Sequence, residues 1–412
     1  MHGIPRCGLI KGVAAALIVG MLCPAGVAAP RSASAEGESP LQVTALDPWS
    51  AMLQWNALPD VARIEIRRDG RLLDDVATSG GTTLSYTDHL LWQSTAYAYE
   101  VIAFDASNQI ISDETTSVTT PAQTAAFPTL YDPASFWNQP IPATAAIDPD
   151  SAAMVSASLA SYAGSANFAN SNEWGKPLAY ANPVSMTYPV GCVRYDCGTS
   201  VSFAIPRYAA PSTGSDHHLA VLDPVTNSEL DMWLASYDAS ADSWSAGSRY
   251  VTALNGWGAQ CSPGQRCQGA VAAGFAAFGG IVRPEEIAQG HIDHALFFAS
   301  PYTRAGDIAC PATHTDGWAS DPAAIPEGAR IQLDPSFDID GQDWPPWEKV
   351  IGHALQSYGA YLGDSGGSVA FSAEPNLDRG YDAWSLAGVP APDPFLTNLP
   401  WSSFRVLQLQ PC

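Results

Sequence analysis

Between residues 40 and 121, hydrophobic and polar positions alternate with a period of two. The alternating runs are separated by Asp-Gly, Ser-Gly-Gly and Ser-Asn turns, which is typical of short strands joined by hairpins. Trp55 and Trp92 are candidate core residues, and a Tyr97-x-Tyr99 pair lies in the longest run. The pattern predicts a small β-sandwich over this segment.

A linker at 120–129 precedes a second pattern, which covers 125–412 without internal repeats. Short hydrophobic runs bounded by turn residues predict strands at 199–208, 217–224, 228–237, 292–300, 329–336 and 404–410. Helical spacing occurs at 148–164, after an acidic cap, and at 345–359, which begins with proline and ends with glycine. We therefore expect a mainly β protein, with an N-terminal sandwich and a larger jelly-roll or β-sandwich domain that carries a few helices.

Residues 1–35 have the pattern of a secretory signal peptide. Arg6 and Lys11 precede an apolar run at 13–23, and small residues follow that run. We therefore expect a secreted, extracellular chain with a sandwich at 40–121 and a catalytic domain at 125–412. No other apolar run is long enough to cross a bilayer, so membrane insertion is not expected.

The chain is strongly acidic, with 18 Lys and Arg, 41 Asp and Glu, and a net charge of −23. Such a charge repels nucleic acid and anionic membrane surfaces, and no run of Lys or Arg forms a local basic patch. Nucleic acid is therefore not an expected partner. A neutral partner, such as a glycan, fits the charge better.

Six of the eight cysteines lie outside the signal segment. An even number in an exported chain indicates disulfides. Spacing favours Cys192–Cys197 and Cys261–Cys267 as two small loops and leaves Cys310–Cys412, although six cysteines allow 15 connectivities. Neither close pair has the C-x-x-C spacing of a zinc site.

The alternating segment resembles a fibronectin type III domain through its two tryptophans and its Tyr-x-Tyr strand. The resemblance implies a spacer or a binding adaptor, with no catalytic residue in this segment. Such modules commonly accompany carbohydrate-active domains in secreted bacterial enzymes, which is an association and not a mechanism.

The pentapeptide GDSGG at 363–367 matches the sequence around the nucleophilic serine of trypsin-like proteases. That chemistry also needs a base histidine and an orienting aspartate, and the family's T-A-A-H-C type motif is absent. A predicted helix leads into the pentapeptide, where the trypsin fold has β-barrel. We therefore expect a glycine-rich turn in which Asp364, and not Ser365, is the residue of interest.

Polar residues interrupt two predicted strands of the larger domain. Asp216 and His218 lie at the start of the first strand, and Glu229, Asp231 and Trp233 share one face of the second. Two carboxylates and an indole in a row predict a sugar-binding surface, with acids for hydroxyls or catalysis and a ring for the pyranose. The plain alternative is an exposed acidic edge.

The second strand, ELDMW, resembles the E-x-D-x-x-E strand of laminarinase-type and lichenase-type jelly-roll glycosidases. The second glutamate of that motif, the family's acid/base, is absent here. A double displacement by two carboxylates would therefore need a partner acid from another strand, and Asp364 and Asp216 are the candidates.

Two further histidines lie in polar segments. His294 falls among hydrophobic residues of a predicted strand, which suits either a satisfied core residue or a desolvated general base. His314 follows a Cys-Pro pair and precedes a tryptophan-bearing loop. His218, Glu229, His294 and His314 are also a candidate set for a divalent metal, although the cupin H-x-H spacing is absent. The sequence requires no cofactor.

Seven short motifs of the larger domain together resemble a family of secreted bacterial proteins. They contain Asp216/His218, Glu229/Trp233, Gly290/His294, Pro311/His314, Pro326/Arg330, Ala354/Tyr358 and Asp364/Gly366. The resemblance extends from SFWNQPIP to LPWSSFRVL and implies activity on carbohydrate, without implying a particular reaction.

The sequence therefore predicts a secreted carbohydrate-active enzyme, and a glycoside hydrolase is the first hypothesis. The predicted catalytic residues are Glu229, Asp364, His218, His294 and His314, and the predicted substrate-binding residues are Asp216, Asp231, Trp233, Arg330 and Tyr358. A polysaccharide lyase that uses His294 and Tyr358 is the second hypothesis, and a non-catalytic glycan-binding or adhesion protein is the third. The oligomeric state is not predicted.

Overall fold

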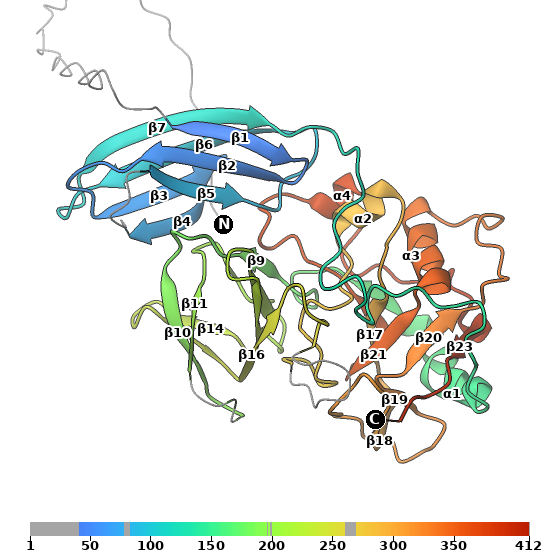
Figure 1. The fold of residues 1–412 in the computed structure, drawn as a ribbon. Helices are drawn as coiled ribbons and strands as arrows, with labels where there is room; N and C mark the ends of the chain where they lie inside the picture. The colour runs from blue at the N-terminus through green and yellow to red at the C-terminus, as the bar shows by residue number, and fades with distance from the viewer. Residues whose placement is uncertain (1–40, 78–82, 196, 198–199, 260–268, 412) are drawn as a thin grey trace, which may run out of the picture. The chain divides into compact units, whose positions relative to one another are not determined.

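The computed structural model describes residues 41–77, 83–195, 197, 200–259 and 269–411, and Figure 1 shows their arrangement. These residues belong to one compact unit built mainly from strands, which confirms the prediction of a mainly β protein with few helices. The predicted signal peptide at 1–35 lies outside the described residues. Among the described residues, no helix has the length and apolarity that a membrane span requires.

Residues 42–119 form two antiparallel sheets whose strands pair only with one another. One sheet has the order β1-β2-β5, and its strands are β1 (Gln42–Asp47), β2 (Ser50–Asn56) and β5 (Thr83–Asp88). The other has the order β4-β3-β6-β7, and its strands are β3 (Arg63–Arg68), β4 (Arg71–Ala77), β6 (Ala96–Phe104) and β7 (Ile110–Thr119). Trp55, a predicted core residue, is buried between the sheets together with Tyr97 and Tyr99.

The larger region contains three sheets of four or more strands. The sheet β11-β10-β15-β14 contains β10 (Thr187–Cys192), β11 (Val201–Ala204), β14 (Ser236–Asp238) and β15 (Ser243–Ala246). The sheet β16-β13-β12-β9 contains β9 (Leu178–Tyr180), β12 (Leu219–Asp223), β13 (Ser228–Trp233) and β16 (Ser248–Ala253).

The largest sheet has the order β23-β20-β21-β17-β22-β8. Its strands are β8 (Asn167–Ala169), β17 (Leu296–Ser300), β20 (Arg330–Leu333), β21 (Ala360–Ser365), β22 (Ala370–Ser372) and β23 (Phe404–Val406). A small two-stranded sheet pairs β18 (Thr303–Ile308) with β19 (Ile325–Glu327). Four strand pairs of the three large sheets are parallel, so these sheets are mixed and depart from the antiparallel order of a jelly roll.

Both predicted helices are present. The first is α1 (Ser151–Ser158) followed by the 3₁₀ turn η1 (Ala160–Ser165), and the second is α3 (Pro346–Ser357). In α3 the apolar face is buried, and Gly359 follows the helix with a φ of 66°. Three short elements left no detectable signal in the sequence, because one or two turns contain no helical period: α2 (Pro284–Gln289), α4 (Ala383–Leu386) and the 3₁₀ turn η2 (Trp401–Ser403).

The sandwich is joined to the larger region by buried polar contacts. Asp74 of β4 accepts hydrogen bonds from the Ser185 hydroxyl and from the Arg207 backbone NH. Arg68 pairs with Asp88 within the sandwich and also donates to the backbone carbonyl of Arg379. Buried hydrogen bonds of this kind hold the sandwich against the larger region, so it is not a flexibly tethered domain.

One predicted disulfide bond is present in full among the described residues, and one partner of a second predicted bond is bonded. Cys192 and Cys197 are bonded, as spacing predicted. Cys310 is also disulfide-bonded, and its predicted partner Cys412 lies outside the described residues, as do Cys261 and Cys267.

Candidate functional site

A cavity of about 530 Å³ lies where several distant chain segments of the larger region meet. Its volume falls in the range of small-molecule sites. Its lining residues are Tyr195, Asp216, His218, Trp233, Ser248, Tyr250, Gly269, Ala270, Val271, Ala272, His314, Thr315, Asp316, Asp364 and Ser365. The cavity therefore gathers five of the ten predicted catalytic and substrate-binding residues, namely Asp216, His218, Trp233, His314 and Asp364.

The loop that carries Asp216 and His218 is held at both ends by hydrogen bonds. The His218 NH donates to the Ser212 hydroxyl at 2.9 Å, and the Leu234 NH donates to the Asp216 carbonyl at 2.8 Å. His217 between them has a φ of 42°, so the chain turns sharply just before β12 begins. This turn directs Asp216 and His218 to the cavity at the end of a buried strand.

The imidazole of His218 is buried, and its Nδ1 has no hydrogen-bond partner among the described residues. Burial, together with the nearby Lys176 ammonium, lowers the pKa of His218 to about 3. The ring is therefore neutral at neutral pH. In that state it can exchange hydrogen bonds with an uncharged hydroxyl, but it is not a proton donor of the imidazolium kind.

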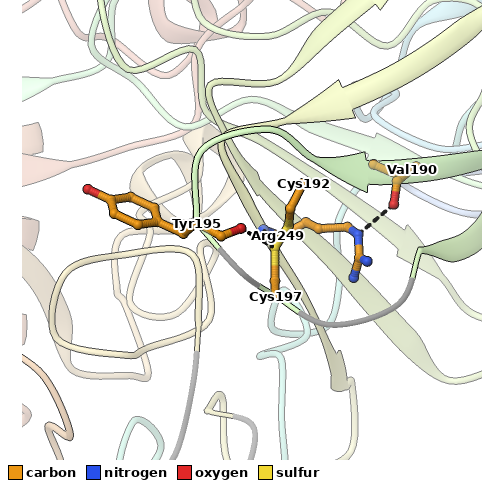
Figure 2. The surroundings of a disulfide bond; sticks show 5 residues. All are labelled: Val190, Cys192, Tyr195, Cys197 and Arg249. Carbon is orange, nitrogen blue, oxygen red and sulfur yellow. Dashed lines mark hydrogen bonds between the residues drawn. A yellow bond between two sulfur atoms is a disulfide. The ribbon is translucent and has the colours of Figure 1, made fainter.

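One wall of the cavity is aromatic. The rings of Trp233 and Tyr195 are stacked with centroids 5.7 Å apart, and the Arg194 guanidinium lies 5.3 Å from the Trp233 ring. The Trp233 indole NH also donates to the Asp216 carboxylate at 3.4 Å. Tyr195 lies within the loop closed by the Cys192–Cys197 disulfide, and Figure 2 shows this loop together with Arg249, which donates to the Val190 carbonyl. The disulfide thus limits the motion of the segment that presents Tyr195.

The GDSGG pentapeptide reaches the cavity at the end of β21. Asp364 and Ser365 lie opposite Ala299 and Ser300 of β17, after an irregularity in the strand register. The Ser365 hydroxyl is buried and has no hydrogen-bond partner among the described residues. A nucleophilic serine needs a base within hydrogen-bond distance, so the arrangement gives no support to a serine-protease site.

Three carboxyl groups meet beside this strand end. Ligand oxygens of Asp316, Glu327 and Asp364 lie within 4.8 Å of one another, and these three residues are called the carboxylate triad below. Asp316 and Asp364 line the cavity, whereas Glu327 at the end of β19 is fully buried. The Ser365 NH donates to Asp316 at 3.2 Å and so links Asp316 to the strand end that carries Asp364.

Gathering these acids in one place makes their ionisation unfavourable. Burial, followed by the proximity of Asp316 and Asp364, raises the pKa of Glu327 to about 10. Burial also raises the pKa of Asp364 to about 7, although Lys176 acts in the opposite direction. The triad is therefore a place where the protein itself compensates ionised carboxylates poorly.

Lys176 is a further member of the site, and no motif in the sequence marks it. Its side chain is 4% exposed, and its Nζ lies 3.7 Å from the centroid of the Phe297 ring with no hydrogen-bond acceptor among the described residues. Burial lowers the pKa of Lys176 to about 8, against the nearby charges of Asp364, Asp231 and Asp216. The sequence contains only three lysines, so the rarity of this side chain was the available signal.

Glu229 and Asp231 lie on one face of β13, as the alternation predicted, but that face is covered. Both are 0% exposed, so the expectation of an accessible acidic surface at these two residues is wrong. Glu229 accepts hydrogen bonds from the Tyr131 hydroxyl at 2.7 Å and from the Phe278 NH at 3.1 Å. Burial and Glu229 together raise the pKa of Asp231 well above its usual range. Neither carboxyl group lines the cavity.

His294 lines a different and much smaller cavity. Its Nε2 lies 3.0 Å from the Glu286 carboxylate and its Nδ1 lies 2.9 Å from the Ala295 carbonyl. Burial opposes protonation of this ring, but Glu286 more than offsets it and raises the pKa of His294. His294 precedes β17 instead of lying within it, so the predicted strand began too early.

Arg330 and Tyr358 are placed together, away from the lining of the cavity. The Arg330 guanidinium donates to the backbone carbonyls of Tyr358 and Gln139, which ties the end of α3 to β20.

The four residues of the predicted metal site do not come together, because His218 and His314 line the cavity whereas Glu229 and His294 do not. Within the described part of the chain, the carboxylate triad is the group of three or more His, Cys, Asp or Glu residues with the spacing of a metal site.

Comparison with known proteins gives likenesses for a small part of the chain. No protein-family model matches the chain, and no curated protein matches it. Among solved structures, it is similar to the sixth fibronectin type III domain of the human fibronectin type III domain containing protein 3 (19% identity, 24% of this chain, 98% of that chain, TM-score 0.17). The fn3 domain of the human collagen alpha-1(XX) chain gives 18% identity, with coverage of 24% and 100% and a TM-score of 0.20.

A family 28 exopolygalacturonase from Yersinia enterocolitica is also similar, at 18% identity and a TM-score of 0.18. The match covers 21% of this chain and 21% of the enzyme. Matches this short and this distant support no conclusion about the cavity.

Proposed function

We propose that this protein is a secreted enzyme that hydrolyses glycosidic bonds of an extracellular polysaccharide in the cavity. The observation that supports this most is the convergence of carboxyl groups, histidines and stacked aromatic rings from distant segments in a single cavity. Glycosidases use one carboxylate to activate water and one carboxylic acid to protonate the leaving oxygen, and aromatic rings pack against the pyranose face of the substrate.

Hydrolysis of a glycosidic bond needs one group that gives a proton to the leaving oxygen and one that assists the attacking water. Asp216 reaches the cavity from the loop before β12, and Asp316 and Asp364 reach it from two other segments. We assign one acid–base role to Asp216, and the carboxylate triad would hold the attacking water. A sugar bound between Asp216 and the carboxylate triad would contact carboxyl groups from separate walls of the cavity.

The aromatic wall and the histidines would position the substrate. The Trp233–Tyr195 stack offers apolar ring faces to the C–H face of a pyranose, and Tyr195 is 57% exposed. His218, neutral by burial, and His314 can exchange hydrogen bonds with sugar hydroxyls. A neutral or weakly charged glycan also suits a chain of net charge −23.

Incubation of the purified protein with a panel of glycans tests the reaction class. New reducing ends without unsaturated products are the expected result. Unsaturated products would replace the hydrolase with a lyase, and retained glycan binding without any cleavage would make the protein a binding or adhesion protein. Each assay is run with and without chelator.

Two variants test the site on a substrate found in this way. Asp216→Asn should lower kcat by about 10²–10⁴-fold, the usual contribution of an acid–base group. Trp233→Ala should raise KM by roughly 3–10-fold, because ring contacts contribute about 0.5–1.5 kcal/mol. Asp223→Asn, at the far end of β12 from Asp216, and Phe395→Ala, at an exposed ring outside the cavity, are matched controls. Full activity of Asp216→Asn would remove Asp216 from the proposed chemistry.

A further inference from the structure

We propose that the carboxylate triad of Asp316, Glu327 and Asp364 binds a hard divalent cation of the calcium class at the wall of the cavity. Its three carboxyl groups come from separate parts of the chain, and their ligand oxygens lie within 4.8 Å of one another. Carboxylate oxygen is the ligand type that calcium, magnesium and manganese prefer.

Glu327 gives an independent reason to place a ligand here. It is 0% exposed, and neither of its carboxylate oxygens makes a hydrogen bond of normal geometry to a described residue, although Asp316 and Thr315 lie beside it. A buried polar group without a partner is costly, and buried charges are normally paired or coordinated to a metal. Glu327 is aimed at Asp316 and Asp364, so a cation between the three groups would satisfy it.

The protein itself offers little compensating positive charge at this place. Lys176 is the basic side chain that acts on Asp364, and its ammonium lies over the Phe297 ring without a hydrogen bond to any carboxylate. The same lysine also interacts with Asp231, Asp216 and Glu229. A divalent cation is the simplest addition that balances this group.

A cation bound by the carboxylate triad would also be accessible from the cavity on one side. Asp316 is exposed and lines the cavity with Asp364, whereas Glu327 closes the buried side. Calcium takes six to eight oxygen ligands, so water or sugar hydroxyls from the cavity would complete its coordination. The use of the cation in holding a glycan rests on the proposed function, but its binding does not.

Binding is measured without any substrate, on the purified full chain after treatment with chelator and dialysis. Titration calorimetry with CaCl₂, and separately with MgCl₂, should give saturable binding of one ion per chain. We expect Kd on the order of 10⁻⁴–10⁻³ M, as in extracellular calcium modules. Thermal unfolding should shift upward with calcium, because the ion binds only the folded chain.

Glu327→Gln and Asp316→Asn should each weaken binding by at least about tenfold, and Asp321→Asn, which removes an exposed acid of the neighbouring loop, should leave it unchanged. Because Asp316 is exposed, its variant keeps the test valid if Glu327→Gln does not fold. No saturable binding up to several millimolar (~10⁻³ M), or unchanged binding by both variants, would overturn the proposal. Glu327→Gln that is more stable than the original chain, with no calcium response in either, would instead indicate a shared proton.

The two proposals fail separately. A chain that binds calcium through the triad but cleaves no glycan overturns the proposed hydrolase and leaves the cation site in place. Cleavage that is insensitive to chelator, by a chain that binds no cation, overturns the cation site alone.

Discussion

Asp74 at the contact between the sandwich and the larger region should make the stability of this protein depend on pH. The residue is 1% exposed, and its carboxylate accepts hydrogen bonds from Ser185 and from the NH groups of Asp75 and Arg207. Burial outweighs these hydrogen bonds and raises the pKa of Asp74 from 3.8 to about 6. The ionised form is therefore less favourable in the folded chain than in the unfolded chain.

The magnitude follows from the difference between the two pKa values. Each pKa unit corresponds to about 1.4 kcal/mol, so ionisation of Asp74 costs about 3 kcal/mol of folding free energy. The folded chain binds more protons than the unfolded chain between pH 3.8 and about 6. This contribution to stability is consequently complete below pH 3.8 and is lost as the pH rises through about 6.

Asp74→Asn isolates this effect. Asparagine can keep all three contacts, because its carbonyl accepts from the two NH groups and its amide donates to the Ser185 hydroxyl. We expect the variant to match the original chain near pH 4 and to exceed its stability by up to about 3 kcal/mol near pH 8.

The assay is urea unfolding, followed by tryptophan fluorescence, from pH 4 to pH 8 at constant ionic strength. Asp60→Asn, at an exposed turn of the same sandwich, is the control and should show no pH-dependent difference. A difference between Asp74→Asn and the original chain that stays constant over the whole pH range would refute the reasoning.

Three further predictions concern stability. Arg379→Met should lower the free energy of unfolding by about 3–5 kcal/mol, because Arg379 is fully buried between Glu285 and Glu374. Urea unfolding measures this loss, and a loss no larger than that of Arg405→Met would contradict the prediction. Gly280→Ala should destabilise the chain by at least about 2 kcal/mol, since φ is 71° and the added Cβ would lie 2.4 Å from Trp137; an unchanged melting temperature would show that this loop can move. Replacing Cys192 and Cys197 by serine should lower stability by about 2 kcal/mol, because the closed loop is short; calorimetry that gives a much larger loss would point to a packing role of the loop.

Local sequence patterns predicted the individual strands and helices more accurately than they predicted the tertiary contacts around them. The period-two runs predicted the sandwich, and the apolar spacing of 345–359 predicted α3, because both signals are contained in a few consecutive residues. The same period correctly placed Glu229 and Asp231 on one face of β13. It did not reveal that Tyr131 and Phe278, from distant segments, cover that face.

The cavity was partly predictable for a related reason. Asp216, His218, Trp233, His314 and Asp364 were selected for their chemical character, and the fold brings all five to one place. Glu327 and Lys176 were missed because each is a single charged residue without a local pattern that marks a site. Their importance depends on tertiary proximity to Asp364, which no local pattern encodes.

The way the sandwich is attached has a consequence for how freely such modules can be exchanged between proteins. The larger region supplies Ser185, the Arg207 NH and the Arg379 carbonyl as hydrogen-bonding partners for side chains of β3 and β4. A foreign fibronectin-like module grafted at residue 120 would lack the matching side chains and would leave these groups buried and unsatisfied. The two parts of this chain have therefore become mutually dependent, so recombination could replace them only as a pair.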